Sequence, residues 1–207
     1  MSDIERVRRK LESVQALEGT QANWSGISYA MRPPIEPMKL AQLERQHGIE
    51  LPDDYRAFLL EIGNGGAGPG YGLYGLEAAL EERGPGVWGL SDPFIPPAST
   101  ADWIDVRAPG MLLIHYNGCA YYDGLVVTGP ARGTTWSYVE VAPGWVPMVR
   151  GELVDADGKP FELQGDYQAW YDVMLLEVNR PRRTSFLEWY EAWLDSVIRA
   201  NRPKSEA

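Results

Sequence analysis

Three glycines in "EIGNGGAGPGYGLYG", residues 61–75, have the spacing of a phosphate-binding loop. Gly63, Gly65 and Gly68 spell G-x-G-x-x-G, in which glycines let the backbone approach a pyrophosphate. In a dinucleotide site the loop follows a strand and opens a helix, whose N-terminus faces the phosphates. Here the loop follows a predicted helix, and no Lys-Ser/Thr pair completes a P-loop. We therefore predict a helix end and a flexible turn rather than a nucleotide site.

Side chains that bind metals or act as nucleophiles are few. The chain has two histidines and one cysteine, and His115 and Cys119 are four residues apart. A zinc site needs further ligands, which the strand-turn-strand pattern around this pair does not offer. A Cys-His nucleophile needs a group that lowers the thiol pKa, and the surrounding sequence is apolar. We predict a structural imidazole, a buried thiol, and no metal or cofactor.

Carboxylates could act as a general acid and base only if two of them faced one pocket. Asp102 and Asp105 are the pair considered for such a hydrolase, but nothing in the sequence brings them together, and G-x-S-x-G is absent. "DADG" at 155–158 resembles the start of a calcium loop, yet the later ligand spacing fails, so a hairpin turn is predicted. The sequence favours a binding module over an enzyme.

The formal net charge of the 207-residue chain is −10. This balance argues against nucleic-acid binding, which requires a basic footprint, and suits a basic protein partner. The single cysteine indicates a reducing compartment, and the charged "MSDIERVRRKLESVQ" lacks the apolar core of a signal peptide. No stretch has the length of a membrane span. We expect a cytoplasmic chain that has a protein partner and binds neither nucleic acid nor membrane.

Helical periodicity is clearest before residue 65 and at the end of the chain. Apolar residues at steps of three and four predict a helix over 2–17, opened by Ser2 and Glu5 in a capping box. A second helix is expected from about 36 to 47, where Gly48 ends it.

The third helix should begin at Pro52 and end through a left-handed residue, either Gly63 or the pair Asn64-Gly65. The segment after it, "YGLYGL", alternates like a strand. Ser185 and Glu188 form a second capping box before the last helix, "FLEWYEAWLDSVI".

The middle of the chain reads as β-structure. "GMLLIHYNG", "CAYYDGLVVTG" and "TTWSYVEVAPGWVPMV" are rich in aromatic and branched residues. Turns between strands are predicted at Asn117-Gly118, Asp123-Gly124 and Gly129-Pro130, and a further helix should start at Asp166. Helices, then strands, then helices predict the α+β class.

Three segments together resemble the SUKH superfamily, which includes the Smi/Knr-type fungal cell-wall regulator and many bacterial immunity proteins. They are "IEPMKLAQLERQHGIELPDDYRAFLLEIGNGG", "MLLIHYNGCAYYDGLVVTGPARGTTW" and "SFLEWYEAWLDSVI". The first is similar to the family's opening pattern of a helix, a Leu-Pro turn, a Tyr/Phe-Leu helix and a terminal Asn-Gly-Gly. Its anchor residues are Leu43, Leu51, Pro52, Tyr55, Phe58, Leu59, Asn64, Gly65 and Gly66.

The resemblance implies a curved, mainly antiparallel sheet flanked by N-terminal and C-terminal helices, spanning residues 35–198. Residues 1–34 would be an N-terminal helix and loop extension, and 199–207 a tail. It also implies stoichiometric binding of a secreted toxin, for which a basic nuclease would suit the acidic charge. A regulatory scaffold without a toxin, and an unrecognised carboxylate-dependent hydrolase, are the alternatives.

A candidate contact surface combines the flexible glycine loop with aromatic and acidic residues. Its predicted members are Tyr71, Tyr74, Glu77, Glu81, Glu82, Trp88 and Asp92. In the competing interpretation the tyrosines point inward and the glutamates line a solvated helix.

Overall fold

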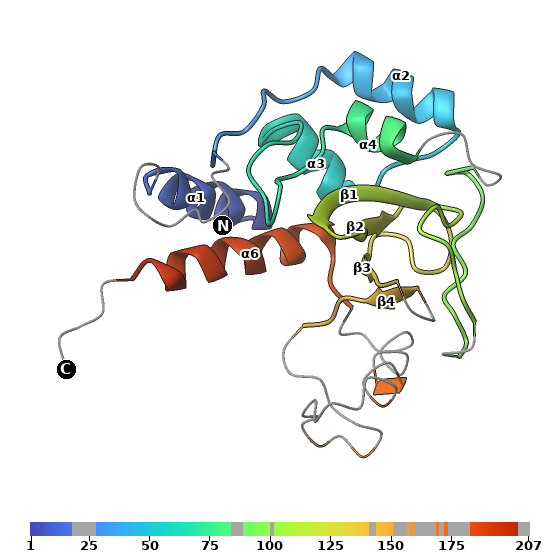
Figure 1. Cartoon of the computed structure of the whole chain (residues 1–207). Helices are drawn as coiled ribbons and strands as arrows, with labels where there is room; N and C mark the ends of the chain where they lie inside the picture. The colour runs from blue at the N-terminus through green and yellow to red at the C-terminus, as the bar shows by residue number, and fades with distance from the viewer. Residues whose placement is uncertain are drawn as a thin grey trace.

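The computed structural model describes residues 1–17, 28–83, 89–99, 102–140, 144–150 and 183–202, with a few single positions between 157 and 173. The described elements are α1 (Asp3–Gln15), α2 (Pro37–His47), α3 (Asp53–Glu61), α4 (Leu76–Arg83), β1 (Met111–Gly118), β2 (Tyr121–Val126), β3 (Thr135–Tyr138), β4 (Trp145–Pro147) and α6 (Phe186–Ala200) (Figure 1). The strands form one antiparallel sheet in the order β1-β2-β3-β4. The prediction of an α+β fold with helices at both ends is confirmed.

Local capping signals fix three of the helix ends as predicted. In α1, the Ser2 backbone N–H donates to the Glu5 carboxylate at 2.9 Å, while the Ser2 hydroxyl accepts from the Glu5 N–H. Ser185 and Glu188 make the same reciprocal pair at the start of α6. Gly48 ends α2 with a φ of +63°, a left-handed conformation that glycine adopts without steric cost.

A left-handed residue was predicted after α3 at either Gly63 or Asn64-Gly65, and the structure excludes Gly63. The helix ends at Glu61, and the following Ile62 is right-handed. Gly63 serves a close approach instead, because a Cβ atom there would lie 2.5 Å from the Arg32 carbonyl oxygen. The left-handed residue is Gly65, with a φ of +87°. Gly65 is required for two reasons. Its φ is positive, and a Cβ atom there would lie 2.5 Å from the backbone nitrogen of Gly75.

The β1–β2 hairpin turns two residues later than predicted. Gly118 pairs with Tyr121, so Cys119 and Ala120 form the turn, with φ values of 49° and 62°. The register shifts between Tyr116 and Gly118, which places an irregularity at Asn117. Because Cys119 stands at the tip of this turn, its thiol is exposed. The prediction of a buried thiol is therefore wrong.

Asp123-Gly124 is not a turn but the middle of β2, where Gly124 pairs with Leu113 and Trp136. Packing explains this glycine: a Cβ atom would lie 2.5 Å from Met111 Sδ and 2.8 Å from the Trp145 ring. Gly129-Pro130 does lie in a turn between β2 and β3. The predicted turn at 155–158 falls almost wholly outside the described residues, as does the start of the helix expected at Asp166.

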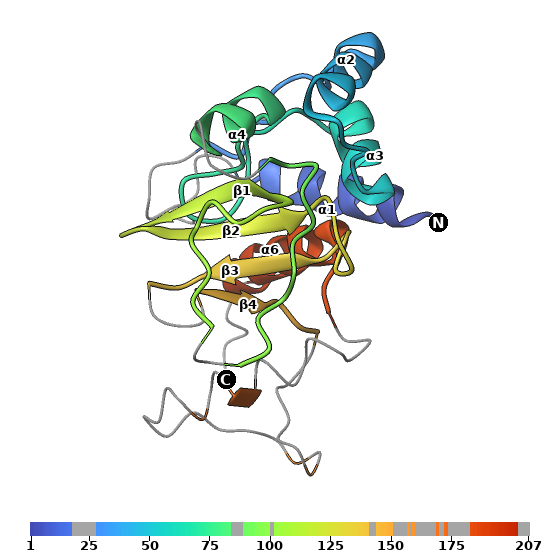
Figure 2. The same ribbon diagram turned by 90° about the vertical axis from the view of Figure 1, so that its right-hand side faces the viewer.

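The sheet has an apolar cluster on each face. In Figure 2 the segment between α4 and β1 crosses one face of the sheet, and α6 lies behind the other. On one face Leu112, Ile114 and Leu125 join the buried side chains of the helices, including Phe58 and Tyr190. The other face carries a second cluster, which the segment between α4 and β1 covers. Its largest members are Phe94, Met111, Trp136, Tyr138 and Trp145.

Helices α1 and α6 lie side by side (Figure 1) and share the first cluster. Val7, Leu11 and Val14 of α1 are buried there. At the rim of this α1–α6 seam, the Arg6 guanidinium donates two hydrogen bonds to Glu191, at 2.6 and 2.8 Å. The predicted extension thus packs on the last helix, while the boundary at residue 34 stays a prediction.

Candidate functional site

The glycine loop before α4 runs along the outer edge of β1. The Gly72 N–H donates to the Pro69 carbonyl at 2.7 Å and closes a tight turn around Tyr71. Leu73 then bridges Gly66 on one side and His115 on the other. The strand-like "YGLYGL" therefore makes isolated bridges, and its turn leaves the Tyr71 side chain 67% exposed.

Three tyrosine rings from different elements follow one another across this edge. The ring centroids of Tyr71 and Tyr116 are 5.8 Å apart with an interplanar angle of 21°, a stacked pair. Tyr116 and Tyr122, which face each other across β1 and β2, are 4.9 Å apart and tilted. The Tyr122 hydroxyl donates to the Glu82 carboxylate on α4 at 3.2 Å. We call Tyr71, Tyr116, Tyr122 and Glu82 the tyrosine surface.

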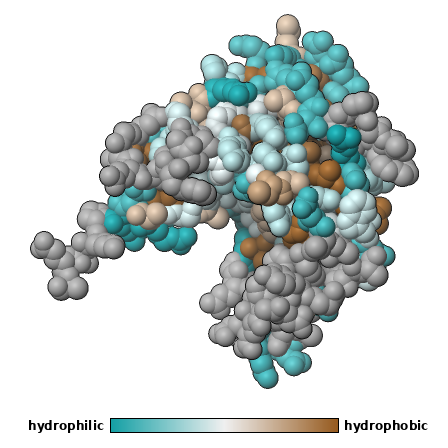
Figure 3. Space-filling view, viewed as in Figure 1, coloured by the Kyte–Doolittle hydropathy of each residue, from teal (hydrophilic) through white to brown (hydrophobic). Residues whose placement is uncertain are grey.

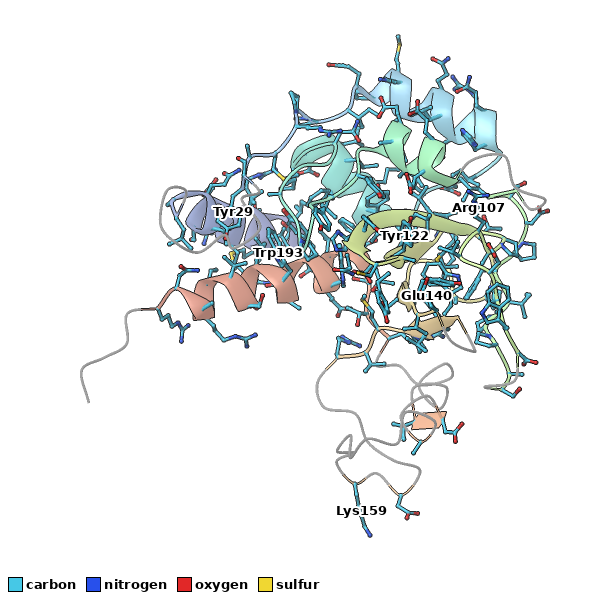
Figure 4. The ribbon with its side chains drawn as sticks, in the orientation of Figure 1. Tyr29, Arg107, Tyr122, Glu140, Lys159 and Trp193 are labelled. Atoms are coloured by element: carbon cyan, nitrogen blue, oxygen red, sulfur yellow. The ribbon has the colours of Figure 1, made fainter. Side chains whose placement is uncertain are left out.

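The phenols of Tyr122 and Tyr74 have raised pKa values and stay protonated at neutral pH. Burial raises the pKa of Tyr122, and the negative charge of Glu82 raises it further, against a smaller opposing effect of Arg107. The same two causes raise the pKa of the neighbouring Tyr74 to about 12. In Figure 4 Tyr122 and Arg107 lie on the same side of the molecule. The surface therefore combines aromatic rings, among them the neutral phenol of Tyr122, with the exposed carboxylate of Glu82.

Glu77 has a structural role. Its carboxylate pairs with Lys39 of α2 and accepts a 2.8 Å hydrogen bond from the Asn64 side chain. Burial raises the pKa of Glu77, but these hydrogen bonds outweigh that effect and lower it to about 2. The other end of the Asn64 amide accepts the Leu76 N–H at 2.7 Å and so caps α4. This network fixes α4 beside the glycine loop.

The other residues of the predicted contact surface do not belong to the tyrosine surface. Glu81 is exposed on α4, next to Glu82, and Tyr74 is half-buried behind the loop. Asp92 accepts the Gly89 N–H at 2.5 Å and closes a short turn of its own. Trp88 lies outside the described residues. The structure thus links Tyr71 to Glu82 through two other tyrosines. Seen from the side of Figure 3, the helices α2 and α4 carry a predominantly hydrophilic surface.

The residues considered for catalysis are used in the fold. Asp102 accepts the N–H groups of Ala98 and Ser99 at 3.0 Å, and Asp105 accepts the Arg107 N–H at 2.8 Å, so both order their own loop. His115 is fully buried and hydrogen-bonded, as a structural imidazole should be. Within the described ranges, no three histidine, cysteine or acidic side chains are placed to share a metal. None of the helices described there could cross a membrane.

Tyr116 and Tyr122 were missed because their meeting depends on strand register. Each looks like an ordinary strand residue in the sequence. Only the two-residue turn at Cys119-Ala120, together with the irregularity at Asn117, places them opposite one another. The alternation of side chains along "MLLIHYNG" and "YYDGLV" allows Tyr116 and Tyr122 to lie on the same face of the sheet. It does not determine the register that pairs the two residues.

Residues 34–150 match the SMI1 / KNR4 family (SUKH-1). The match covers more than half of the chain, so the chain belongs to this family. It contains α2, α3, α4, all four strands and the tyrosine surface, whereas α1 and α6 lie outside it. No curated protein matches the chain.

Proposed function

We propose that this chain is a non-catalytic protein-binding domain that neutralises a cognate toxin, as an immunity protein in the cytoplasm, by binding it one to one. Membership in the SMI1 / KNR4 family (SUKH-1) supports a protein partner. The net charge of −10 supports a basic one, such as a nuclease, because opposite charge accelerates association and favours the right partner.

The observation that carries the proposal is the tyrosine surface. Tyrosine is enriched at the centres of protein interfaces, since it offers a large apolar area with little conformational freedom to lose. Tyr71 is more exposed than the other tyrosines of the surface, yet its ring is held against Tyr116. Glu82 places an exposed carboxylate beside these rings, and the adjacent Glu81 on α4 is exposed as well. An arginine of the partner could stack on the rings and pair with a carboxylate.

The test is co-expression with the secreted protein encoded beside this gene. We expect the toxin domain alone to stop growth, the chain to restore it, and the two to co-purify as a one-to-one complex at physiological salt. A catalytically dead toxin domain should still co-purify, which separates occlusion by binding from any chemical inactivation.

A toxic neighbour that the chain neither binds nor neutralises would refute the immunity role. The alternative of a regulatory scaffold would then be preferred, because it requires a protein partner but no toxin. Rescue without a stable complex would instead contradict the stoichiometric mechanism and favour the hydrolase alternative.

A further inference from the structure

A chain of three polar side chains lies beneath the glycine loop. His115 Nδ1 is 3.0 Å from the Gly72 carbonyl oxygen, and His115 Nε2 is 2.8 Å from Asn117 Oδ1. The other end of this amide, Asn117 Nδ2, donates to Asp123 Oδ2 at 3.4 Å. His115 is 0% and Asp123 4% exposed, whereas the side chain of Asn117, which joins these two buried ends, is exposed. We call His115, Asn117 and Asp123 the buried chain.

The glycine loop rests directly on the buried chain. A Cβ atom at Gly70 would lie 2.9 Å from His115 Cε1 and 3.2 Å from Asn117 Oδ1. Gly70 also has a φ of +47°, so two requirements exclude a larger residue there. Between Gly70 and Gly72 stands Tyr71, which projects from the turn that His115 holds through the Gly72 carbonyl. The buried chain therefore contacts the turn that carries the most exposed ring of the tyrosine surface.

The hydrogen bonds of the buried chain limit how many protons His115 and Asp123 can hold together. The Gly72 carbonyl only accepts, so His115 Nδ1 carries a hydrogen. With the Asn117 oxygen toward His115, Nε2 must also carry one, and the amide nitrogen then donates to an ionised Asp123. With the amide turned over, Nε2 accepts from it, and Asp123 must be protonated to donate to the amide oxygen. Both arrangements keep one proton between His115 and Asp123.

The states with no shared proton or with two are worse. Without the shared proton, His115 Nε2 and the Asp123 carboxylate are both acceptors. The Asn117 amide oxygen then faces one of these two acceptors, whichever way the amide is turned. With two, a positive charge is buried without a counter-charge. Asp123 Oδ1 is itself buried without a hydrogen-bond partner among the described residues, and such an oxygen is less costly on a neutral carboxyl.

Among the described residues, His115 is the charged group that acts on Asp123. Burial raises the pKa of Asp123, while the charge of His115 and the nearby Ser137 hydroxyl on β3 oppose this effect. From α6 the facing group is the uncharged indole of Trp189. The carboxylate of Glu82 on α4 acts on Tyr74 and Tyr122, and it is not among the groups that shift the pKa of Asp123.

We propose that His115 and Asp123 share a single proton through the Asn117 amide, and that this buried chain is the positioning device for Tyr71. Its consequence for partner binding rests on the proposed function, but the device itself belongs to the free protein. Raising the pH until the shared proton is lost should release the glycine loop.

The first experiment uses the two histidines as a matched pair. His47 is exposed at the end of α2, and His115 is buried. The ring nitrogen chemical shifts of both are followed by NMR from about pH 5 to 8, across the range in which an unperturbed histidine titrates. We expect the His115 shifts to stay constant, with Nδ1 protonated throughout, and the exposed His47 serves as the internal reference. A His115 that titrates together with His47 would refute the shared proton.

The second experiment measures hydrogen exchange at the Gly72 amide, corrected for intrinsic rates. Asn117→Ala breaks the buried chain at its most exposed member, and we expect exchange to accelerate about tenfold. Asp123→Asn keeps an amide partner without a titrating proton, so exchange should stay within about threefold of the wild type. In wild-type protein, Gly72 exchange should accelerate once the pH is high enough to remove the shared proton. Asp123→Asn should not show this acceleration.

Unchanged Gly72 exchange in Asn117→Ala would overturn the positioning role. A pH dependence in Asp123→Asn equal to that of the wild type would overturn the shared proton. Both measurements use the free chain, so they stand or fall independently of toxin binding. A chain that shows these results but binds no toxin would disprove only the proposed function.

Discussion

The α1–α6 seam and the tyrosine surface both contain glutamates, but the two regions use them in opposite ways. At the seam the Glu191 side chain is 13% exposed and pairs with both Arg6 and Lys10. Hydrogen bonds from Arg6, followed by those from Lys10, outweigh burial and lower the pKa of Glu191 to about 2. At the tyrosine surface Glu82 is exposed and accepts from the neutral Tyr122 hydroxyl.

The difference separates stability from recognition. A carboxylate that pairs with cations of its own chain contributes to the stability of the fold. Because its charge is already compensated, it attracts a cation of a partner only weakly. A carboxylate held by a neutral phenol has a fixed position and retains its charge, which suits a contact with a basic partner. Substitutions at the seam should therefore change the free energy of unfolding, and substitutions at the tyrosine surface should change binding.

The largest effect is expected in the apolar part of the seam. Leu11 is 4% exposed in the first apolar cluster, which α1 shares with α6, so Leu11→Ala should lower the free energy of unfolding by about 3 kcal/mol. Urea denaturation measures this loss, and Glu12→Ala on the exposed side of the same helix should change it by less than about 0.5 kcal/mol. Equal stabilities for the two variants would mean that α1 does not unfold with the rest of the chain.

A smaller, pH-dependent loss is expected at the rim of the seam. Glu191→Gln should cost about 1–2 kcal/mol at pH 7, because partly exposed Arg6 and Lys10 lose their shared counter-charge. The folded-state pKa of Glu191 is lowered, so its contribution is complete above the unfolded value of about 4.3 and disappears as the pH falls toward about 2. The difference between wild type and variant should therefore shrink between pH 7 and pH 3. A difference independent of pH would contradict the ionic origin.

The smallest change in stability is expected at the tyrosine surface. Glu82→Gln keeps an acceptor for the Tyr122 hydroxyl and removes the charge, so unfolding should change by less than about 0.5 kcal/mol. Association with the toxin domain, followed by stopped-flow at low salt, should slow several-fold, and the difference should fade at high salt. Glu12→Gln changes the net charge equally on the distant α1. If it slows association as much, the field of the whole chain would be responsible rather than the tyrosine surface.

Signals contained within a few residues predicted their structures well. Ser2 with Glu5, and Ser185 with Glu188, satisfy backbone groups within a single turn, so both helix starts were predictable. Gly48 likewise needs only its own backbone conformation to end α2.

Features that depend on a distant partner were not predictable. Asp123-Gly124 has turn composition, but Gly124 makes room for Met111 and Trp145, which only the folded sheet brings together. Tyr71 and Glu82 were predicted as contacts one by one, whereas the rings of Tyr116 and Tyr122 that join them depend on hairpin register. The sequence could name the ends of the tyrosine surface but could not supply its middle.

The most direct test of a dedicated binding surface measures the affinity for the co-purified toxin domain and the free energy of unfolding for the same variants. Tyr71→Ala should weaken binding about tenfold to a hundredfold, as at an interface hot spot, and leave unfolding within about 0.5 kcal/mol of the wild type. Met38→Ala removes a side chain that is 85% exposed on α2 and should change neither quantity. Wild-type affinity in Tyr71→Ala would contradict the account and place the contact surface elsewhere.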